Sequence, residues 1–200
     1  GGAHAAFAVP GASATLPGVD AVSTASSIPL EVPGDAARVA ALDRYDPRPL
    51  ERDAGYDGIV RLAALLFRVP VAAVSMVGAD QVFCKSVVGM AGGPVPRQGT
   101  FCASAVESDV PTIVPDASRD PRFRDHPAVR VEGIRFYAGA PICTPDGERV
   151  GTLCVMQLEP RVVSPAECDA LVALAAQASV HLASQHRGVA MHHQAVLLAL

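Results

Sequence analysis

The chain has 200 residues, of which half are hydrophobic but only 4% are aromatic, and it contains no tryptophan. A chain of this length buries enough apolar surface to fold alone, so we expect one medium-sized domain with a core of Ala, Val and Leu. The formal net charge of −4 and the lack of a Lys/Arg cluster argue against nucleic-acid binding. The apolar runs are shorter than the ~20 residues that span a bilayer, so we expect no membrane association and a cytoplasmic location.

The cysteines favour the same location. Their number is odd, they form no CxxC pair, and their spacing is irregular, at positions 84, 102, 143, 154 and 168. Secreted proteins use cysteines in paired frameworks, so this pattern predicts reduced thiols in a reducing compartment. Histidines gather near the C-terminus without converging carboxylate or thiol partners, and we therefore expect no metal site.

The first part of the chain contains a leader and two helices. Residues 1–34 are rich in Gly, Ala, Pro and Ser and lack any periodicity, which indicates a flexible leader. A short helix is expected over 35–45, ended by Asp46-Pro47. Residues 56–67 predict an amphipathic helix with an apolar side that includes Leu62 and Leu66.

The middle of the chain predicts two strands, a helix and a further strand. Residues 71–77 form a β-branched run typical of a buried strand, and 81–88 are the second arm of a hairpin that turns at 78–80. A short helix is expected over 99–107 and a brief strand over 111–114. Charged, Pro and His residues then make a long polar connection, and such a loop is often functional or covers a pocket.

The last part predicts a hairpin and a long helix. Strands over 134–143 and 149–157 are joined by the turn Thr144-Pro145-Asp146-Gly147. Ser164-Pro165-Ala166-Glu167 is a capping box that opens a helix continuing past His186. This order of elements predicts an α+β fold with a central antiparallel sheet, a domain over 35–186 and a helical extension over 187–200.

Seven short motifs follow one another between about residues 37 and 183. They are Val71–Val77 after Pro70, Lys85-Ser86 with Gly89-Met90, Thr100-Phe101-Cys102-Ala103, Val114-Pro115-Asp116, Pro121-Arg122-Phe123, Arg135–Pro141 and Gly151–Val155. Together they resemble a GAF domain, of the kind found at the front of bacterial sensor histidine kinases and diguanylate cyclases. The resemblance implies helices on one face of the sheet and a ligand cavity on the other, roofed by the middle helix and loops.

The resemblance also suggests which residues bind a ligand. The candidates are Phe83, Lys85, Ser86, Phe101, Cys102, Asp116, Arg122, Phe123, Phe136, Tyr137 and Cys154. Each has a simpler alternative: a turn or surface role for the Lys-Ser pair, ion pairing for the charged residues, and inert core packing for the cysteines. The chain lacks the Cys-His pair that attaches a bilin, and it departs from relatives at Phe83-Cys84 and His126. Neither a cofactor nor a ligand is therefore assigned.

Three functional hypotheses remain open. The first is a sensory domain that binds a small molecule and relays the signal through its terminal helices in a homodimer. The second is a dimerisation or protein-interaction module without a ligand, and the third is a cysteine-based redox sensor. We expect no enzyme, because the connection over 116–130 has no cysteine where related methionine sulfoxide reductases need their nucleophile. The output would lie in a partner or a C-terminal domain, and the apolar stretch 196–200 favours dimerisation.

Overall fold

The computed structural model describes residues 35–45 and 51–198, with side chains up to His186. These residues belong to one compact unit over 31–200. The leader predicted over 1–34 and the side chains of the apolar stretch at 196–200 lie outside the described residues.

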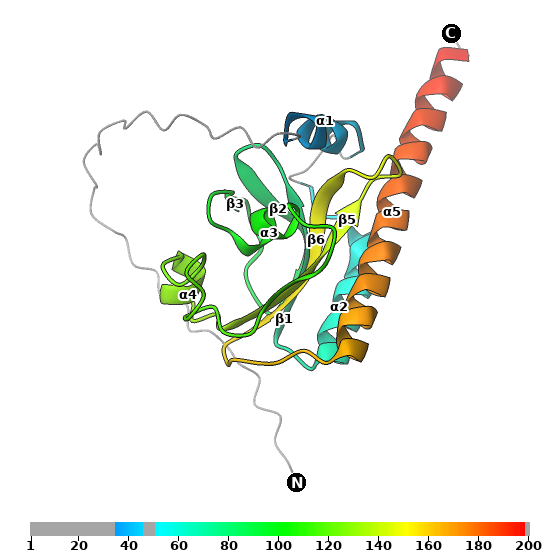
Figure 1. The fold of residues 1–200 in the computed structure, drawn as a ribbon. Coiled ribbons are helices and arrows are strands. Elements are labelled where there is room, and N and C mark those ends of the chain that lie inside the picture. Colours follow the sequence, from blue (N-terminus) through cyan, green and yellow to red (C-terminus); the bar gives the residue numbers. More distant parts are fainter. Residues whose placement is uncertain (1–34, 46–50, 199–200) are drawn as a thin grey trace, which may run out of the picture. The chain divides into compact units, whose positions relative to one another are not determined.

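A six-stranded antiparallel sheet organises the domain (Figure 1). Its strands are β1 (Val71–Val77), β2 (Gln81–Val88), β3 (Val95–Pro96), β4 (Thr112–Val114), β5 (Phe136–Cys143) and β6 (Arg149–Gln157), in the spatial order β3-β2-β1-β6-β5-β4. β1 is buried along its whole length, as its β-branched sequence predicts. The two predicted hairpins, β1–β2 and β5–β6, are confirmed.

The helices cover the two faces of the sheet differently. They are α1 (Asp35–Tyr45), α2 (Asp57–Phe67), α3 (Phe101–Ala105), α4 (Pro127–Arg130) and α5 (Pro165–Leu198), with a single 3₁₀ turn η1 (Ala54–Tyr56) before α2. The longer helices α2 and α5 pack against each other and against one face of the sheet (Figure 1). The short α3 and α4 lie on the opposite face. The predicted α+β class with a central antiparallel sheet is confirmed.

The main core fills the space between the sheet and helices α2 and α5. α5 contributes Leu171, Ala175, Ala178 and Leu182, whose spacing places them on one side of the helix. The apolar side predicted for α2 is confirmed in part: Ile59 and Ala63 pack in the core, whereas Leu62 and Leu66 are 47% and 50% exposed. The helix carries apolar residues on two sides, so its sequence period alone could not show which side faces the sheet.

Two segments differ from the predicted elements. The long polar connection contains the short helix α4, which starts at Pro127 with His126 as its cap, since His126 Nδ1 accepts a hydrogen bond from the Ala128 amide at 3.1 Å. The Gly/Pro-rich segment after β2 contains β3, which pairs with the start of β2. The long C-terminal helix was predicted correctly, and its backbone continues to Leu198.

Helix α1 is attached to the sheet through a buried arginine. Arg38 is 5% exposed and donates hydrogen bonds to the carbonyls of Val77 and Gly78 at the end of β1. Asp35 on the same helix accepts from Arg38 at 2.9 Å and from Arg97 at 2.6 Å. The guanidinium therefore satisfies carbonyls at the β1–β2 turn while its charge is balanced by a carboxylate.

Asp53 joins three elements at one carboxylate. Its Oδ1 accepts from the Gly55 amide at 2.8 Å, and its Oδ2 lies 3.0 Å from Nε2 of His181 on α5 and accepts from the Gln185 amide. Its own backbone amide donates to the Lys85 carbonyl of β2 at 2.9 Å. Burial alone would raise the pKa of Asp53, but these hydrogen bonds outweigh burial and hold the pKa below its ordinary value.

We expect Asp53→Asn to lower the free energy of unfolding near pH 7 by about 1–2 kcal/mol. The pKa of Asp53 is depressed in the folded state, so the carboxylate stabilises the fold above its unfolded pKa of about 4, and this contribution is lost as the pH falls through the folded pKa. Urea unfolding at several pH values measures the difference between the variant and the wild type. That difference should shrink at acid pH.

Asp169→Asn is the matched control, because Asp169 is exposed on the same helix that Asp53 contacts. This variant should unfold like the wild type at every pH. A stability difference for Asp53→Asn that stays constant from neutral to acid pH would contradict the assigned role.

Candidate functional site

The face of the sheet opposite α2 and α5 presents small and hydroxyl-bearing side chains. Ala73 and Ser75 of β1 alternate onto this face, and their partners across the β1–β6 ladder are Cys154 and Thr152. Cys84 of β2 pairs with Ser75 from the other side. We call these five residues the floor.

A roof of short segments covers the floor. It consists of α3 and residues 115–134, including α4. Thr100 caps the start of α3, since its Oγ1 accepts a hydrogen bond from the Ala103 amide at 3.2 Å. Because α3 has five residues and α4 has four, neither is long enough to be stable without its contacts to the sheet.

Three aromatic rings fill the space between roof and floor. Phe101 of α3 stacks on Tyr137 of β5, with ring centroids 4.7 Å apart and planes at 12°, and it lies 4.5 Å from the ring of Phe123. All three residues are at most 5% exposed. Gly139 permits this arrangement, because a Cβ at that position would lie 2.1 Å from the Tyr137 hydroxyl. The space where the family resemblance implies a cavity thus holds a packed aromatic layer.

Three cysteines meet beside this layer. Tyr137 Oη donates to Cys102 Sγ at 3.8 Å, and Ser75 Oγ and Cys84 Sγ lie 3.7 Å apart. A hydrogen bond from Cys154, helped by the nearby hydroxyls, lowers the pKa of Cys102 although burial opposes the shift. The same hydrogen bond, together with burial, raises the pKa of Cys154. Burial raises the pKa of Tyr137 and of Cys84.

The hydroxyl of Thr152 has no hydrogen-bond partner of normal geometry among the described residues, although Thr152 is fully buried. It lies on the floor, where Thr152 pairs with Ser75 across the β1–β6 ladder. An orphaned buried hydroxyl costs stability, so this group is a candidate contact for an incoming molecule.

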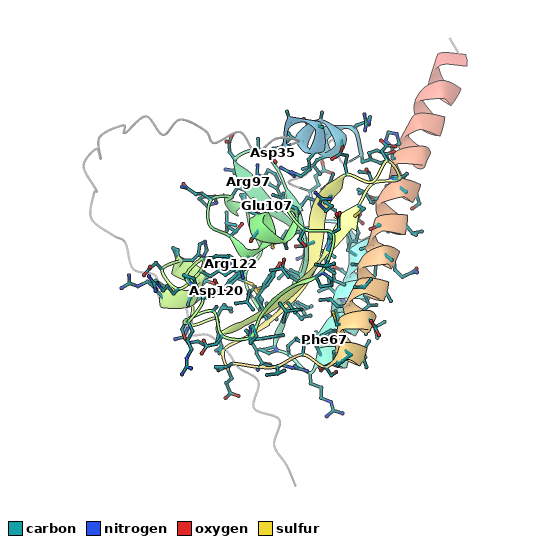
Figure 2. All side chains as sticks on the ribbon, in the orientation of Figure 1. Asp35, Phe67, Arg97, Glu107, Asp120 and Arg122 are labelled. Atoms are coloured by element: carbon teal, nitrogen blue, oxygen red, sulfur yellow. The ribbon has the colours of Figure 1, made fainter. Side chains whose placement is uncertain are left out.

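The predicted charged residues of the roof form local ion pairs. The guanidinium of Arg122 pairs with Asp120 at 2.7 Å (Figure 2). It also lies over the Phe123 ring, 4.7 Å from the ring centroid. The hydrogen bonds from Arg122 hold the pKa of Asp120 below its ordinary value. Asp116 accepts from the Ser118 hydroxyl at 2.6 Å and pairs with Arg119 at 3.3 Å. Asp116 and Arg122 thus each have a partner within the loop and do not pair with each other.

Three of the predicted ligand residues lie apart from this site, and a fourth, Lys85, stands in a β-bulge. Ser86 donates to Asp57 of α2 at 2.5 Å, and Phe136 belongs to the main core on the α2–α5 face. Phe83 packs beside Gly78 at the β1–β2 turn. Lys85 is the extra residue of a β-bulge, because Ser75 pairs with Cys84 while the preceding Val74 pairs with Ser86.

The bulge explains part of this separation. It shifts the alternation of side chains along β2, and nothing in the sequence of the strand marks its position. The site therefore retains Phe101, Cys102, Phe123, Tyr137 and Cys154 from the predicted set, and their contact with a ligand stays a prediction. Ser75 and Thr152 were missed as members of the site, and Cys84 was considered only as a redox cysteine, because strand pairing alone brings these residues beside Cys102.

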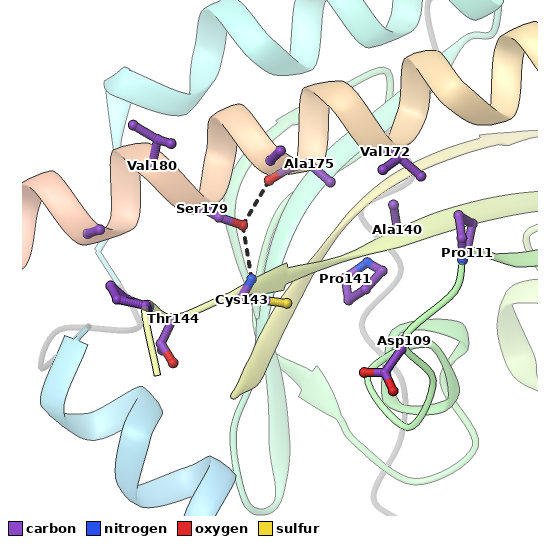
Figure 3. A pocket seen from close by; sticks show the side chains of 13 residues that line it. Asp109, Pro111, Ala140, Pro141, Cys143, Thr144, Val172, Ala175, Ser179 and Val180 are labelled. Atoms are coloured by element: carbon purple, nitrogen blue, oxygen red, sulfur yellow. Dashed lines mark hydrogen bonds between the residues drawn. The ribbon is translucent and has the colours of Figure 1, made fainter. Parts of the chain in front are cut away.

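An apolar groove of about 460 Å³ lies on the other side of the sheet, between α5 and β5 (Figure 3). Pro141 of β5 and Val172 and Val180 of α5 line it. Ser179 also lines the groove and links α5 to β5. Its hydroxyl accepts a hydrogen bond from the Cys143 amide and donates one to the Ala175 carbonyl, each at 3.0 Å. β4 pairs with β5 only as far as Gly139, and so it leaves the rest of that edge open.

Comparison with known proteins identifies the fold. The family model of the GAF domain matches residues 51–182. The chain belongs to the GAF domain family. Among solved structures, the GAF domain of an Acinetobacter phosphoenolpyruvate-protein phosphotransferase is similar, with a TM-score of 0.57 and 17% identity over 76% of this chain and 95% of that one. The blue-light absorbing form of the Thermosynechococcus elongatus PixJ GAF domain gives a TM-score of 0.58, also at 17% identity, over 76% of this chain and 96% of that one.

A sequence relative is more similar in its residues. A cyclic di-GMP phosphodiesterase of Pseudomonas aeruginosa is 39% identical over 126 residues, which is 62% of this GAF chain but 22% of that protein. The match thus spans about a fifth of the relative's length. Within the described residues, no helix combines the length and apolarity needed to cross a membrane.

We expect Phe123→Ala to lower the free energy of unfolding by about 3 kcal/mol, because it removes a buried ring from the layer that joins roof to floor. Arg122→Ala is the matched control at the next position. It removes an ion pair whose arginine side chain is 53% exposed and should cost less than about 1 kcal/mol. Chemical unfolding measures both values. Equal losses for the two variants would show that the ring does not hold the roof.

Proposed function

We propose that this GAF domain receives a signal by binding a small molecule between roof and floor, and that it acts by regulation rather than by catalysis. The observation that carries the proposal is the floor itself: small side chains and a buried, unsatisfied Thr152 hydroxyl lie beneath a roof of short segments. Binding sites of this kind combine apolar walls with a few placed polar groups.

The aromatic layer determines how a ligand would enter. Phe101 and Phe123 belong to the roof, whereas Tyr137 belongs to the sheet. A ligand that displaces the two roof rings would keep the Tyr137 face for stacking and gain the Thr152 hydroxyl for hydrogen bonding. We therefore expect a small, planar and largely apolar molecule with one hydrogen-bonding group.

The sheet connects this site to helices on the far side. β1 and β6 carry floor residues on one face and main-core residues on the other, against α2 and α5. A ligand shifts the domain only if it binds two arrangements unequally, and displacement of roof rings supplies such a difference. The relative from Pseudomonas aeruginosa supports an input role, because this domain matches only about a fifth of that phosphodiesterase and leaves the rest of its length for other domains.

The outer sides of α2 and α5 supply the output surface. Leu62, Leu65 and Leu66 of α2 are 47%, 74% and 50% exposed, and Ala173 on α5 is exposed as well. Exposed apolar side chains on two helices that pack against each other are typical of a protein interface. We infer a homodimer in which these helices pack on their copies in the cytoplasm, next to an output domain or partner.

Native mass spectrometry of protein purified from its own cytoplasm tests ligand binding. We expect a complex whose extra small mass is lost on denaturation. Thr152→Val removes the unsatisfied hydroxyl at nearly constant shape, so it should fold at least as stably as the wild type but retain less of the bound molecule.

Two results would contradict ligand binding between roof and floor, and the first of them would favour a ligand-free interaction module. One is wild-type protein that carries no extra mass and whose melting temperature no metabolite in a panel changes. The other is equal ligand retention by Thr152→Val and wild type, which would place a bound molecule elsewhere.

Leu65→Glu should convert the dimer to a monomer, because it places a charge in the proposed helix interface. Light scattering at tens of micromolar protein measures the change. Val131→Glu is the matched control, since Val131 is 83% exposed but belongs to the roof. A wild-type monomer, or the same mass for both variants, would overturn the assigned surface.

A further inference from the structure

We propose that Cys102 and Cys154 form a reversible disulfide when the domain meets a hydroperoxide, which makes the site a thiol modification site. This inference rests on the cysteine cluster alone and does not depend on ligand binding.

The fold brings the two thiols together from distant parts of the chain. Cys154 lies in the middle of β6, where it pairs with Ala73 on one side and Gly139 on the other, both of which have little or no side chain. Cys102 lies on α3, which contacts β1, β5 and β6, and its side chain packs against the buried cluster that contains Cys154 and Tyr137. Small neighbours on the sheet therefore leave room for the Cys102 side chain beside Cys154, at the junction of roof and floor.

The surroundings of Cys102 favour its thiolate. The Tyr137 hydroxyl donates a hydrogen bond to its sulfur at 3.8 Å, and the Ser75 hydroxyl lies nearby. Hydrogen bonds to a thiolate stabilise that form, and they lower the pKa of Cys102. Burial raises the pKa of Cys84 and Cys143 instead. Cys102 is thus distinguished from those two thiols by its hydrogen-bond donors.

Exposure assigns different roles to the pair. Cys102 is half-buried and Cys154 is 1% exposed, so Cys102 is the thiol nearer to the surface. The hydrogen bond to Cys102 and burial both raise the pKa of Cys154. Cys102 is the attacking thiol, and Cys154 is the thiol that resolves the product.

The chemistry balances without a further reagent. The Cys102 thiolate attacks one oxygen of the hydroperoxide, the O–O bond breaks, and the leaving oxygen takes a proton to give an alcohol or water while Cys102 becomes a sulfenic acid. The Cys154 sulfur then attacks the Cys102 sulfur, its proton leaves with the hydroxyl as water, and the S–S bond forms. Two thiols are oxidised by two electrons, and the peroxide is reduced.

The bond would fasten the roof to the floor. α3 is otherwise held by side-chain packing and by its contacts with β1, β5 and β6. A covalent link from position 102 to position 154 limits how far the roof can move away from the sheet. Oxidation therefore selects the closed arrangement, and a thiol reductant restores the original one.

The test uses the full reduced chain, treated with a small excess of hydrogen peroxide, then acid-quenched and alkylated under denaturing conditions. The mass of the treated wild type should fall by two hydrogens. It should then accept three alkyl groups, whereas the untreated reduced chain, with its five cysteines, accepts five. Peptide mapping should find Cys102 linked to Cys154, and dithiothreitol should restore all the thiols. Failure of the ligand test above would leave these results unchanged, since no ligand is added here.

Variants separate the two roles. Cys154→Ser should stop at a sulfenic acid on Cys102, which dimedone traps, and Cys102→Ser should lose thiols about tenfold more slowly than the wild type. Cys168→Ser should behave like the wild type, because Cys168 lies on α5, outside the cluster. Should a variant fail to fold, labelling of the wild type by iodoacetamide decides, with Cys102 reacting about tenfold faster than Cys143.

Three outcomes would overturn the proposal. They are five free thiols after peroxide treatment, a cross-link between other cysteines, and labelling of Cys102 that is no faster than that of Cys143.

Discussion

The pairing of β1 with β6 at the centre of the sheet is the interaction on which the other features depend. The ladder runs from Val71–Met156 to Met76–Gly151 without interruption, and both strands are almost wholly buried. At its end the backbones approach so closely that a Cβ at Gly151 would lie 2.4 Å from the Ser75 carbonyl oxygen. Because side chains alternate along these strands, this one ladder supplies residues to the main core and to the floor at once.

The two faces of this ladder are built for different purposes. On one face, α2 and α5 bury an apolar core that includes Phe67, Leu171 and Leu182. On the other, the roof is made of one-turn helices and turns joined to the floor by three rings and a cluster of thiols and hydroxyls. Rearranging the roof would break few backbone hydrogen bonds, whereas rearranging the helices would expose the main core. Moving the roof therefore costs less free energy than moving the helices, and we assign signal reception to the roof face of the sheet.

Much of this architecture could be predicted from the sequence. Turn residues at Pro145 and Gly147, and the capping box at Ser164, locate a hairpin and a helix start by local chemistry, and the structure confirms both. The buried side of α2 could be predicted only in part, because Leu62, Leu65 and Leu66 make the helix apolar on a second side. That second side is the proposed dimer surface, and only the packed sheet distinguishes it from the core side.

The site was predictable only in part, for a related reason. Motif resemblance pointed to Phe101, Cys102, Phe123, Tyr137 and Cys154, which the fold does bring together. It also included Ser86 and Phe136, which point to the opposite face. Side-chain direction depends on strand register, and a single bulge at Lys85 changes it without any signal in the local sequence. The convergence of Cys84, Cys102 and Cys154 likewise depends on long-range pairing.

Native-state hydrogen exchange tests whether the roof opens while the β1–β6 ladder stays closed. The amides of Phe123 and Val129, which are hydrogen-bonded within the roof, should exchange at least about 100-fold faster than those of the β1–β6 ladder, which should open only with global unfolding. Equal protection of roof and ladder would mean that the two open only together. That result would contradict a domain that receives its signal by moving the roof.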